Sequence, residues 1–207
     1  MTEIAAAADV IDQMLDVEAG DRLDGVRRAR PTAREQAQVA YDAIFRPAHP
    51  GALSIAERYA VAYAVAAWTG VPAVTDHYRS ALTTHESRPE MLAALEHVIT
   101  DGAGAGPFGE FREPGLAQHG SDGNRLVVEA TDAQVLGDEL AALLAHAHAL
   151  VLRPRESSPQ LLERLVAVGW EATEIVALAQ LVSYLSFQTR LVAGLQVLRS
   201  TWIETAA

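Results

Sequence analysis

The sequence predicts an all-α protein, and two observations lead to this prediction. The 207-residue chain is 50% hydrophobic, with Ala, Leu and Val dominant and the glycines concentrated in a few loops, a composition that favours helices. Apolar residues also recur every three to four positions through most of the chain, which is the period of an α-helix. We therefore expect a single helical domain over residues 1–207 with one sizeable core.

The net charge and the absence of cysteine exclude several classes of function. A formal net charge of −11 argues against a nucleic-acid partner, because no basic face offsets the repulsion. Without cysteine the chain has no disulfide, no thiolate nucleophile and no thiolate metal ligand. The first residues lack the pattern of a signal peptide, and no window approaches the roughly 18 uncharged apolar residues of a membrane span. We expect a soluble, cytoplasmic protein with no membrane contact.

Residues 1–50 form a predicted N-terminal helical extension. Apolar spacing predicts one helix over residues 3–18 and a shorter one over residues 23–30. Thr32 and Glu35 have the Ser/Thr-x-x-Glu spacing of a capping box, so a third helix is expected to begin there.

Residues 51–100 contain the most informative stretch of the chain. Ser54 and Glu57 form another capping-box signature, ahead of an Ala- and Val-rich helix. A Trp-Thr-Gly-Val-Pro break follows, and Pro72 suits the first turn of the next helix, which carries His77. The stretch therefore predicts two successive helices, with an acid at the start of one and a histidine within the other.

Residues 101–130 are predicted to be a glycine-rich loop. Its glycines do not match a phosphate-binding loop, because no strand precedes them and no Lys-Ser/Thr follows. A loop of this length in a compact domain is usually functional, an excursion over a partner subunit, or mobile. The sequence leaves these three interpretations open.

Residues 131–203 form the second helical half of the prediction. Thr131 and Gln134 have capping-box spacing, so a helix with a leucine stripe is expected to begin there. Ser158-Pro159 begins the next helix, as cap and first-turn residue, and the last helix is expected over residues 171–203.

No metal site is predicted. His146 and His148 lie two positions apart on one helix, so their side chains point about 200° away from each other and cannot bind one metal ion together. Each of these two residues can instead be an ordinary, partly buried histidine.

The two halves resemble each other along the sequence. The pattern His77-x-x-x-Ala-Leu recurs 84 positions later as Leu161-x-x-x-Leu-Val. Glu139 is the rough counterpart of Glu57, with a slip of two residues. We expect two helix-pair repeats that pack into one core about a pseudo-twofold axis.

The stretch from Glu57 to His77 resembles the carboxymuconolactone decarboxylase and alkylhydroperoxidase D family. The core of that family reads Glu, a helix, then Cys-x-x-Cys-x-x-x-His with a leucine soon after the histidine. Glu57, His77 and Leu82 match this pattern, while Gly70 and Ala73 stand at the two cysteine positions.

The resemblance covers residues 53–91 and 131–198, and it implies an alkylhydroperoxidase D-like helical fold with two tandem repeats. The first repeat keeps the acid and the histidine, and the second is degenerate. Cysteine-based peroxide reduction is excluded without a thiol, and no cofactor is implied. The decarboxylase branch implies proton transfer by Glu57 and His77 on a lactone or another small organic acid. The candidate substrate-binding residues are Trp68, Tyr78 and His148.

Structural interpretations of the same residues stay open. If Glu57 only closes a capping box and His77 only packs, the chain is a structural or regulatory partner of a cysteine-containing relative. If both are catalytic, they should share a small pocket left by Gly70 and Ala73, within a direct or one-water hydrogen bond. Apolar helices such as residues 175–198, together with the resemblance, predict a homo-oligomer.

Overall fold

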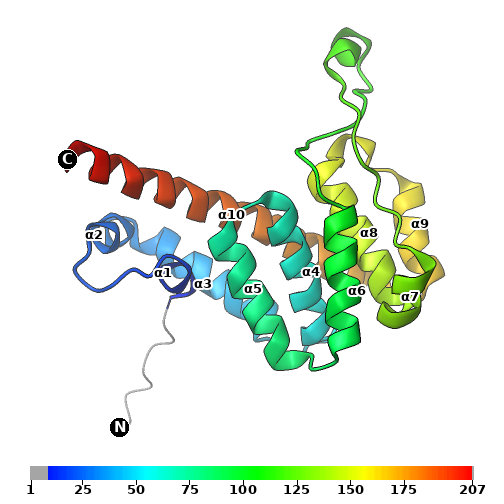
Figure 1. Ribbon diagram of the computed structural model, residues 1–207, viewed down its shortest axis with the longest axis horizontal. Coiled ribbons are helices and arrows are strands. Elements are labelled where there is room, and N and C mark those ends of the chain that lie inside the picture. The colour runs from blue at the N-terminus through cyan, green and yellow to red at the C-terminus, as the bar shows by residue number, and fades with distance from the viewer. Residues whose placement is uncertain (1–8, 207) are drawn as a thin grey trace.

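The computed structural model describes residues 9–206, with side chains as far as Trp202. These residues form helices joined by loops (Figure 1), and no β-strand occurs among them apart from an isolated bridge between Gly109 and Ser121. The all-α prediction is confirmed. The elements are α1 (Val10–Met14), α2 (Arg22–Arg28), α3 (Pro31–Phe45), α4 (Ile55–Thr69), α5 (Pro72–His85), α6 (Pro89–Asp101), η1 (Pro114–His119), α7 (Ala130–Leu136), α8 (Asp138–Leu152), η2 (Pro154–Glu156), α9 (Pro159–Ala167) and α10 (Ala172–Ala206).

Helix α4 is the centre of the core. Its residues from Arg58 to Ala66 are all buried, and the helix packs against α3, α5, α6, α8 and α10. The many alanines of α4 let the neighbouring helices approach closely. The buried guanidinium of Arg58 donates hydrogen bonds to the backbone oxygens of Ile44, Pro50 and Leu53, so each of its three nitrogens has a protein partner.

Helices α4 and α5 form a tight hairpin, as the sequence predicts. The Ser54 capping box is present, and α5 begins at Pro72. Gly70 ends α4 with φ 73°, in the left-handed region that glycine tolerates best. The short connection makes the helices antiparallel, so that Tyr59 near the start of α4 stacks on His85 at the end of α5, with 5.0 Å between ring centroids.

Three other predictions about helix boundaries are wrong. Helix α3 begins at Pro31 and α7 begins at Ala130, so Thr32 and Thr131 lie inside the first turn instead of capping it. The helix predicted from Thr131 onward is broken at Gly137, where φ is 87° and α7 meets α8 at an angle of 115°. A glycine at this position lets the chain turn sharply without steric strain.

Helix α1 is shorter than the predicted helix over residues 3–18, of which residues 3–8 lie outside the described part. Asp9 caps α1 by accepting hydrogen bonds from the backbone N–H groups of Ile11 and Asp12. The helix ends at Met14, and Asp16 then adopts φ 48°.

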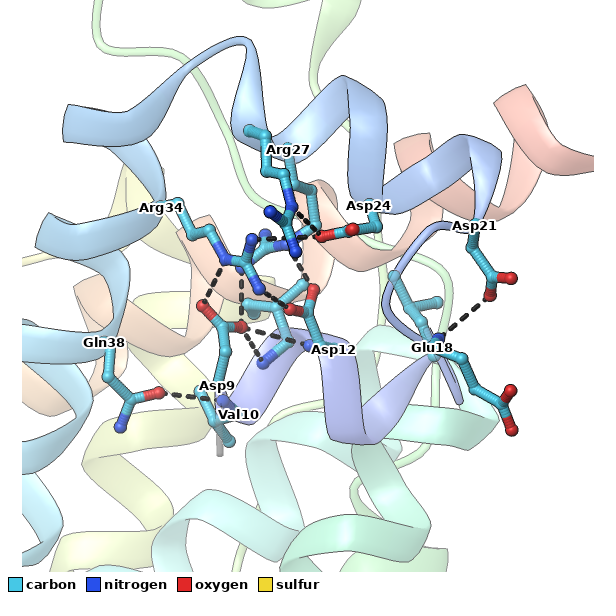
Figure 2. Close-up of polar contacts among 12 residues, drawn as sticks. Asp9, Val10, Asp12, Glu18, Asp21, Asp24, Arg27, Arg34 and Gln38 are labelled. Carbon is cyan, nitrogen blue, oxygen red and sulfur yellow. Dashed lines mark hydrogen bonds and ion pairs between the residues drawn. The ribbon is translucent and has the colours of Figure 1, made fainter. Parts of the chain in front are cut away.

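A buried ionic network connects α1, α2 and α3 (Figure 2). The side chain of Arg27 lies 2.5 Å from Asp9 Oδ1 and 2.5 Å from Asp12 Oδ1. Arg34 forms ion pairs with Asp9, Asp12 and Asp24. Because each buried charge has an opposite charge beside it, a connected set of interactions joins the two short helices α1 and α2 to α3.

Residues 102–129 form an arm that leaves α6, projects away from the helices with η1 near its tip, and returns to α7 (Figure 1). The arm corresponds to the predicted loop. Arg155 donates a hydrogen bond to Pro107 O at 3.1 Å, and Arg112 donates one to Ser157 O at 2.6 Å. The base of the arm is thus bonded to the α8–α9 connection, while an excursion over a partner subunit stays a prediction.

Helix α10 is the longest helix, and its C-terminal part runs out over the N-terminal helices (Figure 1). Contrary to our expectation, its segment Ala172–Trp202 is long and apolar enough to cross a membrane by length and composition. Within this segment, 44% of the most apolar 18-residue stretch is buried inside the protein. Core helices of soluble proteins meet the same criterion, so it does not assign a location.

The helices of the two halves recur at similar spacing. Helices α4, α5 and α6 begin at residues 55, 72 and 89, whereas α8, α9 and α10 begin at residues 138, 159 and 172. Corresponding starts are therefore 83, 87 and 83 residues apart, close to the offset of 84 found in the sequence. The pseudo-twofold relation itself stays a prediction.

Candidate functional site

The carboxylate of Glu57 closes the capping box of α4. Its Oε2 atom accepts hydrogen bonds from Ser54 N at 2.8 Å and from Ser54 Oγ at 2.6 Å. Glu57 also lines a pocket of about 400 Å³ together with Glu139, Glu171 and Glu174. These carboxylates do not form a group that could hold a metal ion, and no such group occurs in the described part of the chain.

His77 lies in a cluster of aromatic side chains between α3, α4 and α5. Its Nε2 atom is 3.1 Å from the hydroxyl of Tyr41, and its ring meets that of Tyr78 edge-on at 5.0 Å. Burial, helped by the nearby charge of Arg46, lowers the pKa of His77 to about 4. The imidazole is therefore neutral near pH 7.

The direct hydrogen bond expected between Glu57 and His77 is absent among residues 9–206, where each side chain has other partners. The reason is the antiparallel hairpin. Residues at equal distance from the turn lie level with each other, so His77 lies opposite the C-terminal half of α4. Glu57 is at the N-terminal end of the same helix, roughly 10 Å away along the axis by helical rise. The catalytic roles of both residues stay predictions.

The three candidate substrate-binding residues have structural partners. Tyr78 is fully buried, and its hydroxyl donates a hydrogen bond to Gln188 Oε1 at 2.5 Å. Trp68 donates a hydrogen bond from Nε1 to Ile99 O at 3.1 Å. His148 lies edge-on to Trp68 at 5.0 Å, and its Nε2 is 3.0 Å from Gly102 O. The contact of Tyr78 joins α5 to α10, whereas those of Trp68 and His148 join α4, α6 and α8 at the point where the arm begins.

A pocket of about 710 Å³ lies at Gly70, one of the two cysteine positions of the family pattern. The arm residues 104–107 form one wall, and Trp68 and Arg190 contribute to the others. The sequence predicts a pocket beside His77, but His77 does not line the pocket at Gly70. The space at Gly70 is therefore separate from the histidine cluster.

An uncharged groove of about 490 Å³ lies between α3 and α10. Val176, which lines this groove, is 56% exposed, and Phe187 on the same face of α10 is 49% exposed. Apolar side chains that gather on one exposed face often mark an interaction site. The groove is lined by Ala40, Ala43, Ile44, Val176, Ala179, Gln180, Ser183 and Tyr184.

Sequence reasoning missed a pocket of about 620 Å³ between α8 and α9. One wall consists of Ala142, Ala145 and Ala149, and His146 lies on the same face of α8. A signal for this pocket exists in the sequence. The alanines recur at helical spacing on the face of α8 opposite its buried leucines, so that face has no large side chains to fill the space beside it.

No protein-family model, curated protein or solved structure matches this chain significantly. The resemblance to the carboxymuconolactone decarboxylase family therefore depends on the sequence pattern alone, chiefly on the spacing of Glu57, His77 and Leu82.

Proposed function

We propose that this protein is a self-associating structural or regulatory component, and not a catalyst that depends on Glu57 and His77. The observation that carries this proposal is the separation of the two side chains. Glu57 is held by the capping box of α4, and His77 is bonded to Tyr41 in a cluster of aromatic rings. Both residues contribute to the fold in ways that need no substrate.

The uncharged groove between α3 and α10 supports association with a second copy. The outer face of α10 has one stripe of residues at helical spacing, in which small and apolar side chains prevail. Arg190 is the charged residue of this stripe. The stripe consists of Val176, Ala179, Gln180, Ser183, Phe187, Arg190, Gly194 and Val197.

A twofold axis at Ser183 would make this stripe complementary to itself. In an antiparallel pair of α10 helices, Phe187 of one copy lies opposite Ala179 of the other and faces the groove. Arg190 of one copy then lies level with Val176 of the other, near the end of the contact. The small residues in the middle let the two helices approach closely.

Light scattering coupled to size-exclusion chromatography tests self-association at micromolar concentration. We expect a dimer or a higher oligomer for the wild type and a monomer for Phe187→Glu, because the change places a charge in the apolar contact. Val166→Glu is the matched control, since Val166 is an exposed valine on α9, 60% exposed and away from the groove. A monomeric wild type would contradict the proposal.

Acid–base chemistry on a small organic acid or lactone is the second candidate. It is favoured by the position of His77, a half-buried imidazole whose Nε2 lies 3.1 Å from the hydroxyl of Tyr41, so that a proton can pass between the two side chains. If the chain is such an enzyme, changing Glu57 or His77 to Ala should lower its activity by about 10²-fold or more. Activity that survives both changes would remove this candidate.

The remaining expectations about partners form part of the same proposal. We expect the protein to be cytoplasmic, to bind neither nucleic acid nor membranes, and to pair either with itself or with a cysteine-containing relative. Co-purification with such a relative would identify a mixed assembly. Recovery of the protein in a membrane pellet would instead assign the apolar face of α10 to a bilayer.

A further inference from the structure

The pocket between α8 and α9 has a charge opposite in sign to that of the whole chain. Arg125, Arg153 and Arg164 line it, against the single carboxylate of Glu156. Glu156 pairs with two of these arginines, with Arg153 at 2.5 Å and with Arg125 at 2.6 Å. Arg164 is exposed and has no ion pair within the described residues, so positive charge is left over at the rim.

The start of α9 adds to this positive character. Ser158 and Gln160, at the N-terminal end of α9, both line the pocket. Ser158 stands at the cap position, but its side chain forms no capping hydrogen bond, so its hydroxyl is available. Free backbone N–H groups at a helix N-terminus attract anions.

His146 provides an independent sign that a ligand belongs in this pocket. The residue is only 6% exposed, and its Nδ1 atom is buried without a hydrogen-bond partner. Burial lowers the pKa of His146, while a hydrogen bond with the backbone of Leu161 opposes this shift. A neutral imidazole with an unsatisfied buried nitrogen destabilises a fold unless another molecule bonds to it.

The space between the rim and His146 is apolar. Small and aliphatic side chains from α8, α9 and the returning arm surround it, and a volume of about 620 Å³ lies in the range of small-molecule sites. The lining apolar residues are Leu126, Val127, Ala142, Ala145, Ala149, Leu161, Ala167 and Val168.

We propose that this pocket binds a small carboxylate that has an apolar body and a hydroxyl or carbonyl group at its far end. The carboxylate lies at the rim, between Arg164 and the start of α9. The apolar body fills the space along the alanine wall of α8, and the far polar group forms a hydrogen bond with Nδ1 of His146. Binding here does not depend on association through α10.

Isothermal titration calorimetry with four matched probes tests this assignment. The probes are octanoate, 8-hydroxyoctanoate, octane-1,8-diol and octylammonium. We expect 8-hydroxyoctanoate to bind most tightly and octanoate several-fold more weakly, because octanoate leaves His146 without a partner. The diol and the amine should bind at least tenfold more weakly than 8-hydroxyoctanoate, since they lack the negative charge.

Single substitutions separate the parts of the site. Arg164→Gln should weaken the binding of both carboxylates about tenfold and leave the diol unaffected. Ala145→Leu should abolish binding by filling the pocket. Arg79→Gln, which changes an exposed arginine on α5 outside the pocket, should bind like the wild type.

His146→Leu should remove the preference for 8-hydroxyoctanoate over octanoate. Without ligand, this variant should melt at or above the temperature of the wild type, because an unpartnered buried nitrogen is replaced by an apolar group. A large loss of thermal stability would show that His146 has a structural role and would overturn its assignment. Equal affinity for all four probes, no binding of either carboxylate, or unchanged binding by Ala145→Leu would overturn the site itself.

Discussion

The helix pairs α4–α5 and α8–α9 each contain a histidine with a lowered pKa, half-buried His77 in the first and buried His146 in the second, but the surroundings of the two histidines differ. In the first pair, His77 is bonded to the hydroxyl of Tyr41. In the second, His146 has a buried Nδ1 atom without a hydrogen-bond partner and faces a pocket. The same residue type therefore packs among aromatic rings in one half and lines a pocket in the other.

The connections between the helices explain this difference. Only residues 70–71 separate α4 from α5, so these helices pack as an antiparallel hairpin along their length. Residues 153–158, which include η2, separate α8 from α9 and leave room between the helices. Aromatic rings fill the first interface, whereas alanines line the second. A longer connection and smaller side chains together produce the pocket.

Truncating the aromatic core of the first pair should have the largest effect. Tyr78 is fully buried and its ring packs at a tilt against that of Phe45, so Tyr78→Ala should lower the free energy of unfolding by about 3–5 kcal/mol. Leu161→Ala, in the wall of the second pocket, should cost less than about 1 kcal/mol because Leu161 already borders open space. Urea unfolding measures the free energy of unfolding of both variants. Equal losses of stability would mean that the α4–α5 and α8–α9 interfaces are packed alike.

The stability of the first pair should depend on pH through His77. Its pKa falls from 6.5 to about 4 on folding, so the unfolded chain binds the proton more readily between these values. The neutral form therefore contributes stability that is fully present above pH 6.5 and is lost as the pH falls towards 4, by up to about 3 kcal/mol.

The difference between wild type and His77→Phe isolates this effect, because the pKa values of His146 and His148 are lowered as well and act in the same direction. Urea unfolding at pH 7.5 and pH 5 should show a smaller change for the variant. An identical pH dependence in both proteins would contradict the burial of a neutral His77.

Cysteine at the two positions of the family pattern should be tolerated unequally. Gly70→Cys should cost about 1–2 kcal/mol, because φ of 73° is unfavourable for any residue with a Cβ atom. Ala73→Cys, in the first turn of α5, should change stability by less than about 0.5 kcal/mol. Thermal unfolding compares the stabilities of the two variants.

The wild type should show no thiol-dependent peroxidase activity. Peroxide turnover in the variant that carries both Gly70→Cys and Ala73→Cys would support the family resemblance.

The two serines that precede α4 and α9 provide the smallest contrast. Ser54 accepts a hydrogen bond from Glu57 N at 3.2 Å, so Ser54→Ala should cost about 1 kcal/mol. Ser158 forms no such bond, and Ser158→Ala should cost only a few tenths of a kcal/mol. Thermal unfolding of both variants tests this, and a larger loss at Ser158 would reverse the comparison.

Local signals in the sequence predicted the fold class and the α4–α5 hairpin correctly. Ser54, Glu57 and Pro72 act on their own backbone neighbours, so their effects can be read without knowing the packing. Gly137 was missed, because a glycine inside a helical pattern is compatible both with a continuous helix and with a break. Only the packing of α7 and α8 decides between the two.

The candidate site was less predictable than the fold. Glu57 and His77 were expected to meet because their order along the chain matches a family pattern, but the direction of the hairpin separates them. The sequence alone does not distinguish His146 from an ordinary histidine, because an unpartnered nitrogen is visible only when the surrounding side chains are placed. Spacing along one helix predicts a shared face, and it does not predict what lies opposite that face.

The ionic network of the N-terminal helices has a consequence for the order in which the chain folds. Helix α1 has only five residues, far fewer than the roughly 12–15 that a helix needs to persist alone in water. Its charged partners Arg27 and Arg34 come from α2 and α3. We therefore expect α1 to form only after those helices have docked. It should be among the last segments to become protected from hydrogen exchange during refolding, and among the first to open in the native state.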